Sequence, residues 1–480
     1  MDIFDAIALR TATREFHPKK KIPPAYVEKI LDATRWTPSP ENVQHHRWII
    51  VKDQKIKDLI ADMAWEVNIS NLQKTPVESV INYFWGLPEN ARAPLLEQFS
   101  DPHRTDYIKN AEYLLIPCIN GRWYDVTYFV APEAFGVRVT SLAVANLWTA
   151  ATALGIGVSF LISAFEDQRR RMEIHDLLGV PTDWSLMGAL AIGMPKHPVM
   201  KAPKFPLESI AFDNYWGRPW KRVGFRNNPT SQKAVQAAAK ASYYTSYLDT
   251  FDAIYMRRSI RHFKMDKDGK PLKIPDWKIE MLLNSARMAA SPGNTQPWRF
   301  VVVRDQEIKE LIADAAQEHA VFVFGVVPYE MVSDRLYYIR KGVHPGIMEY
   351  MADGSLMRYP ERASVTILPA VNFRWTSAAH TFSSEVVGGL SISFAIMNIW
   401  NSCPALGLGL GYNALPTTDI RKQQVICDAV GIPRSWEVLT TLNVGIPATL
   451  RAASPSRFPL GSMIFNEYWG RRYHRIGFEK

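Results

Sequence analysis

The hydrophobic pattern alternates between helical and strand-like segments, and the same alternation occurs in both halves of the chain. Apolar residues at helical spacing predict helices at Val27–Thr34, Ile56–Met63, Trp277–Met288 and Ile308–Ala315. Short, continuous apolar runs predict buried strands at Trp48–Val51, Leu114–Asn120, Leu186–Gly193, Phe300–Val303, Val365–Asn372 and Val438–Gly445. Strands separated by helices favour an α+β fold, in which each half has an α/β mixed sheet flanked by helices.

Two long segments without charge raise the question of a membrane span. Residues 139–165 and 386–418 contain no Asp, Glu, Lys or Arg. Each holds an Asn and a Trp near its middle and then breaks into Ala-Leu-Gly-Ile-Gly or Ala-Leu-Gly-Leu-Gly. A buried helix of about 10 to 14 residues that runs through glycine into a strand explains this pattern better. We therefore expect no membrane partner.

The two halves of the chain are copies of one unit. Phe4-Asp5-Ala6-Ile7 recurs 247 residues later, and Ser39-Pro40-x-Asn42-x-Gln44 recurs 252 residues later. The tails, each with Tyr-Trp-Gly-Arg, recur at an offset of 253. A nearly constant offset over so long a stretch predicts one fold for both copies. We expect unit 1 at residues 1–225, a linker at 226–250 and unit 2 at 251–480.

Composition and charge narrow the classes of function. The 480 residues are 47% hydrophobic and 21% charged, which is typical of a globular chain with two cores. The net charge of +9 favours anionic ligands. Basic residues are spread along the chain without a nucleic-acid-binding motif, so a small phosphate-bearing molecule fits better than a nucleic acid. Three scattered cysteines and a start without a secretory signal indicate the cytoplasm, with neither disulfides nor a metal site.

One basic motif is suited to bind a phosphate. Arg257-Arg258-Ser259-Ile260-Arg261 places three guanidinium groups and a hydroxyl at the end of a helical turn. Such donors suit a phosphate monoester, although a solvated basic helix end explains the motif equally well. In the first copy the same positions are Arg10-Thr11-Ala12-Thr13-Arg14, which keep the two flanking arginines.

Two further segments could contribute to the same ligand site. A basic residue precedes Phe-Pro-Leu near the end of each unit, Lys204 in the first and Arg457 in the second. The loop Ser291–Trp298 carries Ser, Asn and Gln side chains that can pair with the edge of a heterocycle. Ordinary turn chemistry is the alternative interpretation of that loop.

Taken in order, these motifs resemble the FMN-dependent nitroreductase family. The order is Arg-Arg-Ser-x-Arg-x-Phe, then Ser-x-x-Asn-x-Gln-Pro-Trp-Arg-Phe, then an apolar helix ending Ala-Leu-Gly-Leu-Gly, then Arg-x-Pro. The resemblance covers both halves and is stronger in the second. That family forms an intertwined homodimer with an FMN at each of two sites between the subunits. The resemblance implies that this chain is such a dimer fused into one pseudo-dimer, with one or two FMN per chain and a larger oligomer left open.

The resemblance also implies which residues bind FMN. In the family, the early basic motif and the late Lys or Arg hold the phosphate, and the Ser/Asn loop of the other subunit borders the isoalloxazine. One site would combine Arg257, Ser259, Arg261 and Arg457 with Pro38, Ser39 and Asn42 of the first half. The other would combine Arg10, Arg14 and Lys204 with Ser291, Pro292 and Asn294 of the second half. Arg258 either joins the first of these sites or points elsewhere.

The two copies depart from the family pattern in different ways. In the first, Ala12 stands in place of the serine, and His45-His46 replace Pro-Trp. Each charged hydrogen bond contributes roughly 1.5–3 kcal/mol, so the loss of one or two lowers phosphate affinity by about one to three decades. We therefore expect the site with Arg257 to bind FMN more tightly.

A second resemblance favours the other site for redox chemistry. Asn71 and Lys74 resemble a pair at the flavin edge of bacterial members, and the second copy has Val323 and Val326 at these positions. A cation there would stabilise the reduced, anionic flavin. A solvated helix face is the alternative interpretation of Lys74.

The resemblance implies an FMN-dependent oxidoreductase. Its electrons would come from NAD(P)H, bound transiently, and would pass to an organic acceptor such as a nitroaromatic compound or a quinone. The flavin carries the hydride chemistry, so we name no catalytic side chain and interpret His45, His46 and Cys403 as structural. The alternatives are a flavin-sequestering protein without turnover and a flavin dehydrogenase or dehalogenase of the same family.

Overall fold

The fold is described from a computed structural model of the chain. The structure describes residues 1–74, 101–120, 132–198, 202–223, 248–326, 341–375, 384–449 and 456–473. Most of the linker expected at 226–250 lies outside these residues, since the described part stops at 223 and resumes at 248.

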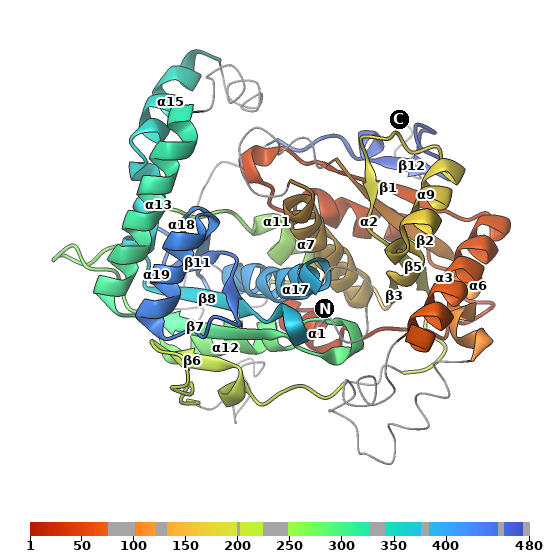
Figure 1. Cartoon of the computed structure of the whole chain (residues 1–480), viewed down its shortest axis with the longest axis horizontal. Helices are drawn as coiled ribbons and strands as arrows, with labels where there is room; N and C mark the ends of the chain where they lie inside the picture. Colours follow the sequence, from red (N-terminus) through yellow and green to blue (C-terminus); the bar gives the residue numbers. More distant parts are fainter. Residues whose placement is uncertain are drawn as a thin grey trace.

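The protein has two six-stranded sheets, one in each half, on either side of the central helices (Figure 1). The first has the order β12-β1-β2-β5-β3, with β4 beside β2. Its strands are β1 (His46–Val51), β2 (Tyr113–Ile119), β3 (Gly157–Leu161), β4 (Ser185–Leu186), β5 (Ala189–Gly193) and β12 (Ile464–Asn466). The second has the order β6-β7-β8-β11-β9, with β10 beside β8. Its strands are β6 (Ala211–Asp213), β7 (Trp298–Val303), β8 (Val365–Val371), β9 (Gly409–Asn413), β10 (Glu437–Val438) and β11 (Thr441–Gly445).

Each sheet is completed by a strand from the other half. Strand β12 pairs in parallel with β1, with Phe465 opposite Ile49, and β6 pairs in parallel with β7, with Phe212 opposite Val301. All other strand pairs in the two sheets are antiparallel. The tail of each unit therefore lies on the sheet of its twin, and the two halves are interlocked (Figure 1).

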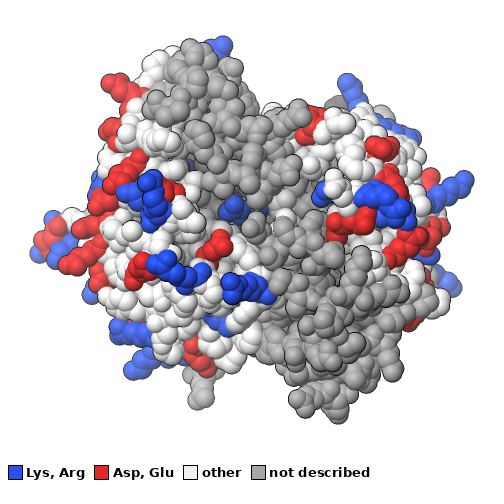
Figure 2. Space-filling model, in the orientation of Figure 1, with Lys and Arg blue, Asp and Glu red and all other residues white. Residues whose placement is uncertain are grey.

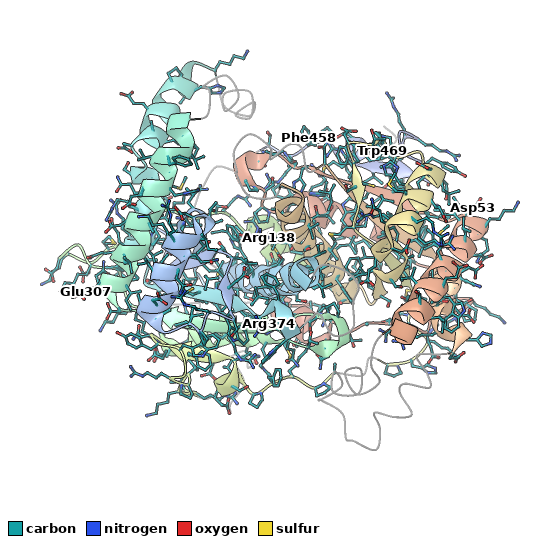
Figure 3. All side chains as sticks on the ribbon, in the orientation of Figure 1. Asp53, Arg138, Glu307, Arg374, Phe458 and Trp469 are labelled. Atoms are coloured by element: carbon teal, nitrogen blue, oxygen red, sulfur yellow. The ribbon has the colours of Figure 1, made fainter. Side chains whose placement is uncertain are left out.

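Aromatic rings hold these tails in place. Trp469 lies with its ring centre 4.7 Å from Trp184 and 4.6 Å from Phe465. Trp216 lies 5.0 Å from Trp436 and 4.9 Å from Phe212. Figure 3 shows the labelled Trp469 on the tail over the first sheet. The repeated Tyr-Trp-Gly-Arg motif thus serves contacts within the chain.

Helices surround both sheets (Figure 1). The first half has α1 (Ile3–Leu9), α2 (Pro24–Arg35), α3 (Gln54–Lys74), α6 (Asp106–Asn110), α7 (Pro132–Ala153), α8 (Ser163–Glu166) and α9 (Gln168–Leu177). The second has α11 (Thr250–Met256), α12 (Asp276–Arg287), α13 (Gln306–Val326), α15 (His344–Ala352), α16 (Tyr359–Arg362), α17 (Ser384–Ala405), α18 (Leu415–Thr418) and α19 (Ile420–Val430). Sheets flanked by helices confirm the α+β fold.

Local chemistry explains where several helices begin and end. Helices α1 and α11 begin after Asp2 and Asp249, whose carboxylates accept hydrogen bonds from backbone N–H groups of the first turn. Helix α19 begins in the same way after Asp419 and ends at Gly431, which has a φ of 73°. The equivalent helix starts in the two halves thus use the same cap.

The central helices α7 and α17 pack against each other where the two halves meet (Figure 1). Asn401 donates a hydrogen bond to the side-chain oxygen of Asn146 at 2.8 Å, and the rings of Trp148 and Phe394 meet edge to face. Helix α17 is long and apolar enough to cross a membrane. However, 94% of its most apolar stretch, within Val386–Ala405, is buried inside the protein. Its apolar composition is therefore that of a core helix, which confirms the expected helix running through glycine into a strand.

Three expectations about element bounds are wrong. Helices α7 and α17 have 22 residues each instead of about 10 to 14. Helix α7 begins before its uncharged run, whereas α17 lies almost wholly within its own run. Helices α3 and α13 have 21 residues each and extend beyond the expected segments. The last strand of each unit is split into two. In the first half the split falls at Gly188, whose φ is 151° and where a Cβ would lie 2.7 Å from the carbonyl oxygen of Leu161.

Candidate functional site

Each basic motif lies at the end of a short helix and contacts the opposite half. Arg257 follows α11 and donates from Nη2 to the backbone oxygen of Trp36 at 2.9 Å. Arg10 follows α1 and donates from Nη2 to the backbone oxygen of Met288 at 3.2 Å. Trp36 and Met288 occupy the same position of the repeat, so the two contacts are equivalent.

Both arginines have donors without an acceptor. Arg257 is 2% exposed, and its Nε and Nη1 atoms have no hydrogen-bond partner in the described part of the chain. The Nε of Arg10 likewise has no partner there. Burial lowers the pKa of Arg257 well below its usual value, and the neighbouring Arg457 and Arg258 lower it further. Burial lowers the pKa of Arg10 to about 10. A buried cation with unused donors favours an anionic ligand.

In each basic motif, the first arginine packs against a tryptophan of a central helix. The guanidinium carbon of Arg257 lies 4.7 Å from the ring centre of Trp400, and that of Arg10 lies 4.8 Å from Trp148. The indole N–H of Trp400 donates to the backbone oxygen of Arg258, and that of Trp148 donates to Thr11. The packing of α7 and α17 thus fixes the position of both arginines.

The late basic residues lie beside the loops of the opposite half. Arg457 donates to the side-chain oxygen of Asn42, and Asn42 donates back to the carbonyl of Ser456 at 2.9 Å. Lys204 donates to the side-chain oxygen of Asn294 at 3.1 Å and to the carbonyl of Ala289 at 2.7 Å. Burial, followed by the charges of Arg10 and Arg287, lowers the pKa of Lys204 to about 7.

The Ser/Asn loops are shaped by their own turn bonds. Ser39 accepts from the backbone N–H of Gln44 at 3.0 Å, and Ser291 accepts from Gln296 at 2.9 Å. Pro38 directly precedes Ser39, and Pro292 begins the 3-10 turn Pro292–Asn294. Four residues of these loops have positive φ angles, a conformation that non-glycine residues rarely adopt: 57° at Asn42, 49° at Gln44, 59° at Asn294 and 48° at Gln296. Such backbone strain is common where a loop contacts a ligand.

The remaining motif residues have contacts outside the groups described above. Ser259 is exposed and pairs by a β-bridge with Leu410, and Ala12 pairs in the same way with Val158. Arg261 is half-buried, with its guanidinium carbon 6.0 Å from the ring centre of Tyr359. Arg14 is exposed, in contrast.

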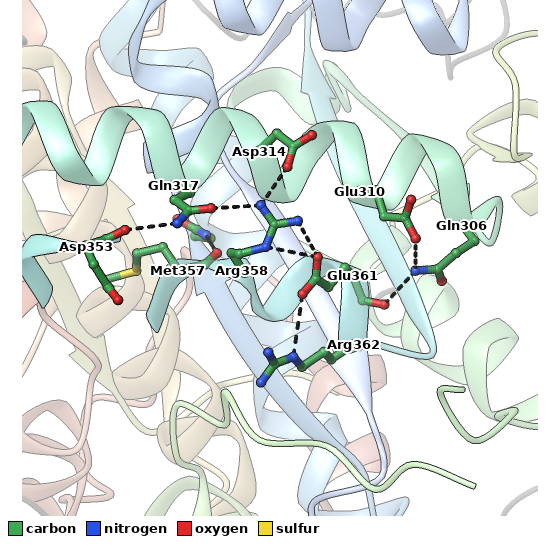
Figure 4. Close-up of polar contacts among 10 residues, drawn as sticks. Gln306, Glu310, Asp314, Gln317, Asp353, Met357, Arg358, Glu361 and Arg362 are labelled. Carbon is green, nitrogen blue, oxygen red and sulfur yellow. Dashed lines mark hydrogen bonds and ion pairs between the residues drawn. The ribbon is translucent and has the colours of Figure 1, made fainter. Parts of the chain in front are cut away.

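A polar network fixes the segment that carries Tyr359. The neighbouring Arg358 donates to Asp314 at 2.6 Å and to Gln317 at 2.8 Å, both on α13, and to Glu361 at 2.6 Å (Figure 4). The hydroxyl of Tyr359 donates to the backbone oxygen of Tyr412 at 2.6 Å. These contacts hold the aromatic ring against which Arg261 lies.

The structure thus assembles two composite clusters across the halves. We call the first the Arg257 site; it comprises Arg257, Arg258, Arg457, Trp36 and Asn42. The guanidinium carbons of Arg258 and Arg457 lie 5.6 and 5.7 Å from the ring centre of Trp36, so Arg258 joins this cluster. We call the second the Arg10 site; it comprises Arg10, Lys204, Asn294 and the backbone of Met288. Asn71 and Lys74 lie in the last turn of α3, and their side chains are outside the described part.

His45, His46 and Cys403, which we interpret as structural, are all buried. His45 is buried between Thr140 and the carbonyl of Gly136, and burial lowers its pKa to about 3. The thiol of Cys403 is buried and faces the carbonyl of Ile399. In the described residues, no group of three His, Cys, Asp or Glu side chains could hold a metal ion. On the face in Figure 2, basic side chains are interspersed with acidic ones.

Sequence reasoning missed the aromatic part of the site. Trp148 and Trp400 recur at an offset of 252 inside the uncharged runs, and this repetition could have indicated a shared role. Trp36 could have been found by comparing the two copies, because the second copy has Met288 at that position.

The two interlocked α+β halves place a cationic cluster at each of two equivalent positions. The donors present, above all the unused guanidinium donors, fit the phosphate of FMN. A model of the Nitroreductase family matches the chain twice, over residues 7–194 and 254–446. The chain therefore belongs to the nitroreductase family, as a tandem duplicate, and is a flavin-dependent oxidoreductase.

Similar proteins match one unit at a time. Protein DrgA of Synechocystis is 23% identical over 246 residues, which cover 45% of this chain and 95% of that protein. An NADH dehydrogenase of Thermus thermophilus is 35% identical over 105 residues, 21% of this chain and 47% of that protein. The crystal structure of a nitroreductase with bound FMN from Desulfitobacterium hafniense is 18% identical and covers 43% of this chain and 95% of its own, with a TM-score of 0.30.

Proposed function

We propose that the chain binds FMN at the Arg257 site and at the Arg10 site, and that it transfers electrons from NAD(P)H to an organic acceptor. Nitroaromatic compounds and quinones are the acceptors that we expect. When bound, FMN supplies the hydride chemistry. The protein's own residues bind the phosphate, orient the ring system and exclude water. We further propose that the protein acts in the cytoplasm.

The observation that carries this proposal is the state of Arg257. Its buried guanidinium has two nitrogen atoms without an acceptor, and no described carboxylate forms an ion pair with it. A buried charge without a counter-ion is strongly unfavourable, so an anionic ligand would stabilise this group. A phosphate monoester offers several charged oxygen acceptors to such donors.

The placement of the loops supports a ring system beside the phosphate. Asn42 and Asn294 belong to loops of the half opposite to the arginines that they accompany, and each contacts a late basic residue. The strained loop backbone keeps these amides in place without help from a ligand. A planar heterocycle between the two halves would therefore meet preformed polar groups.

The electron donor is proposed from the relatives. One relative is named an NADH dehydrogenase, and the family name itself refers to nitro compounds. We propose that NADH or NADPH binds transiently over the flavin, and that the acceptor follows it into the same space.

The test is the absorption spectrum of the purified full-length protein, with the released flavin counted per chain. We expect a yellow protein with up to two FMN, bleached by NADH or NADPH without oxygen and recoloured by a quinone or nitroaromatic compound. A colourless protein that takes up no FMN would contradict the proposal. A yellow protein that neither nucleotide bleaches would favour the sequestering alternative instead.

A further inference from the structure

The Arg257 site contains a side chain that has no counterpart in the Arg10 site. The backbone carbonyl of residue 36 or 288 accepts from the motif arginine in both. The side chain is the indole of Trp36 in one and the thioether of Met288 in the other. The backbone contact therefore does not explain the indole.

The contacts of Trp36 surround its ring with cations and leave its N–H unused. The guanidinium carbons of Arg258 and Arg457 lie 5.6 and 5.7 Å from the ring centre, and the ring of Tyr255 lies 5.5 Å away. The Nε1 atom is buried and has no acceptor among the described residues. A buried indole N–H in a native protein usually has a partner.

The indole ring of Trp36 also explains how several arginines can lie close together in the Arg257 site. The negative face of an indole attracts guanidinium groups, whereas its N–H edge carries positive charge. Cations at the face and an N–H at the edge both favour a negative charge nearby. Arg257, which is 2% exposed and has two free donor atoms, provides an independent sign of the same ligand.

We propose that the indole N–H of Trp36, supplied by the first half, donates a hydrogen bond to a phosphate oxygen at the Arg257 site. The ligand class is a phosphate monoester, or free phosphate in its absence. Trp36 is thus a binding residue that makes the two sites unequal. This proposal rests on the proposed flavin function only in taking FMN as the phosphate ester.

The test uses the full-length protein after removal of flavin, titrated with FMN and with riboflavin, which lacks the phosphate. Trp36→Phe keeps an aromatic ring and removes the N–H. We expect it to weaken FMN binding at one of the two sites by about 10-fold or more, the effect of one hydrogen bond to a charged acceptor. We expect riboflavin affinity to change by less than about twofold, because riboflavin lacks that acceptor.

The control is Trp277→Phe, which changes a half-buried tryptophan of α12 outside the cluster and should leave both affinities unchanged. An equal loss for FMN and riboflavin would show that Trp36 only shapes the site, and no loss for either would overturn the proposal directly.

A measurement on the unaltered chain keeps the proposal testable if Trp36→Phe folds poorly. In protein labelled with 15N at the tryptophan indoles, the Trp36 resonance should move on addition of FMN and of inorganic phosphate, and move less with riboflavin. It can be assigned by its absence from the spectrum of a second variant, Trp36→His. If the Trp36 resonance does not move on addition of phosphate, the proposal is wrong. If the protein binds phosphate but no flavin, only the proposed flavin function is contradicted.

Discussion

The Arg257 site and the Arg10 site share their backbone geometry and differ in their side chains. Three members of the Arg257 site are stronger or additional donors than the residues aligned with them: Trp36 for Met288, Arg258 for Thr11 and Arg457 for Lys204. In a homodimer, both sites are encoded by one sequence and must stay identical. A fused duplicate encodes each site separately, so one can bind more tightly while the other changes.

The difference is also electrostatic. The pKa of Arg257 falls well below its usual value, since neighbouring arginines add to burial, whereas that of Arg10 falls only to about 10 by burial. Crowded cations in a buried place repel one another until an anion arrives. The Arg257 site should therefore gain more from a phosphate than the Arg10 site does.

The largest effect is expected from Arg257→Met, which removes the buried guanidinium and keeps much of its volume. Two to three charged hydrogen bonds to the phosphate would be lost, so FMN affinity at this site should fall by about three decades. The flavin-free protein should be no less stable, because an uncompensated buried charge is removed. Flavin per chain after gel filtration and urea unfolding measure the two effects.

The matched variant is Arg10→Met at the equivalent position. It should remove flavin from the other site and cause a smaller loss of affinity. Identical losses in the two variants would refute the inequality of the sites.

The next effect concerns the exchanged tails, which deliver Arg457 to one site and Lys204 to the other. Trp469→Ala should lower the free energy of unfolding by about 2–4 kcal/mol, since it removes the contacts of a half-buried tryptophan with Trp184 and Phe465. It should also weaken FMN binding at the Arg257 site, because the loosened tail carries Arg457. Denaturant unfolding and flavin titration report both changes.

Trp216→Ala is the counterpart in the other tail and should weaken the Arg10 site instead. If each variant affected both sites alike, the tails would act on general stability and not on their own sites.

The sequence predicted the shared fold and much of the cationic clusters. The constant offset predicted equivalent elements in the two halves. The resemblance to the nitroreductase family implied a shared site for Arg257, Arg457 and Asn42, and the structure brings these three residues together. The exchange of β6 and β12 could not be predicted, because strands of three residues carry almost no periodicity and their parallel pairing depends on the packing of the two halves.

The length of α7 and the place of Trp36 in the site could not be predicted from the sequence either, for physical reasons. Helix α7 is longer than expected since Glu133 and Arg138 lie in its first turns, outside the uncharged window. Trp36 belongs to no motif, and its role depends on arginines that are more than 200 positions away in the sequence. Tertiary contact, not local pattern, gives such residues their function.

A third effect separates the sites by pH. Lys204 has a pKa of about 7, lowered by burial and by the charges of Arg10 and Arg287, and it also contacts Asn294. As pH rises from 7 to 9, this lysine loses its proton while the guanidinium of Arg457 keeps its charge. Phosphate affinity at the Arg10 site should therefore fall by about 10-fold over this range, and affinity at the Arg257 site should change less.

Lys204→Arg should abolish the fall, because a guanidinium stays protonated. The measurement is a titration of the flavin-free protein with FMN at several pH values, all above the second ionisation of the phosphate. A slope that persists in Lys204→Arg would assign the titration to another group.

The smallest effect compares the outer arginines of the two motifs. Arg261 is half-buried, and its guanidinium lies beside the ring of Tyr359. Because the hydroxyl of Tyr359 donates a hydrogen bond to the backbone of Tyr412, this ring stays in place and restricts the position of Arg261. Arg14 is exposed, and solvent weakens any contact that it makes. Arg261→Ala should therefore reduce FMN content several-fold more than Arg14→Ala, as counted by released flavin per chain. Equal reductions would mean that solvent exposure does not distinguish these arginines, and the inequality of the sites would then rest on Trp36, Arg258 and Arg457 alone.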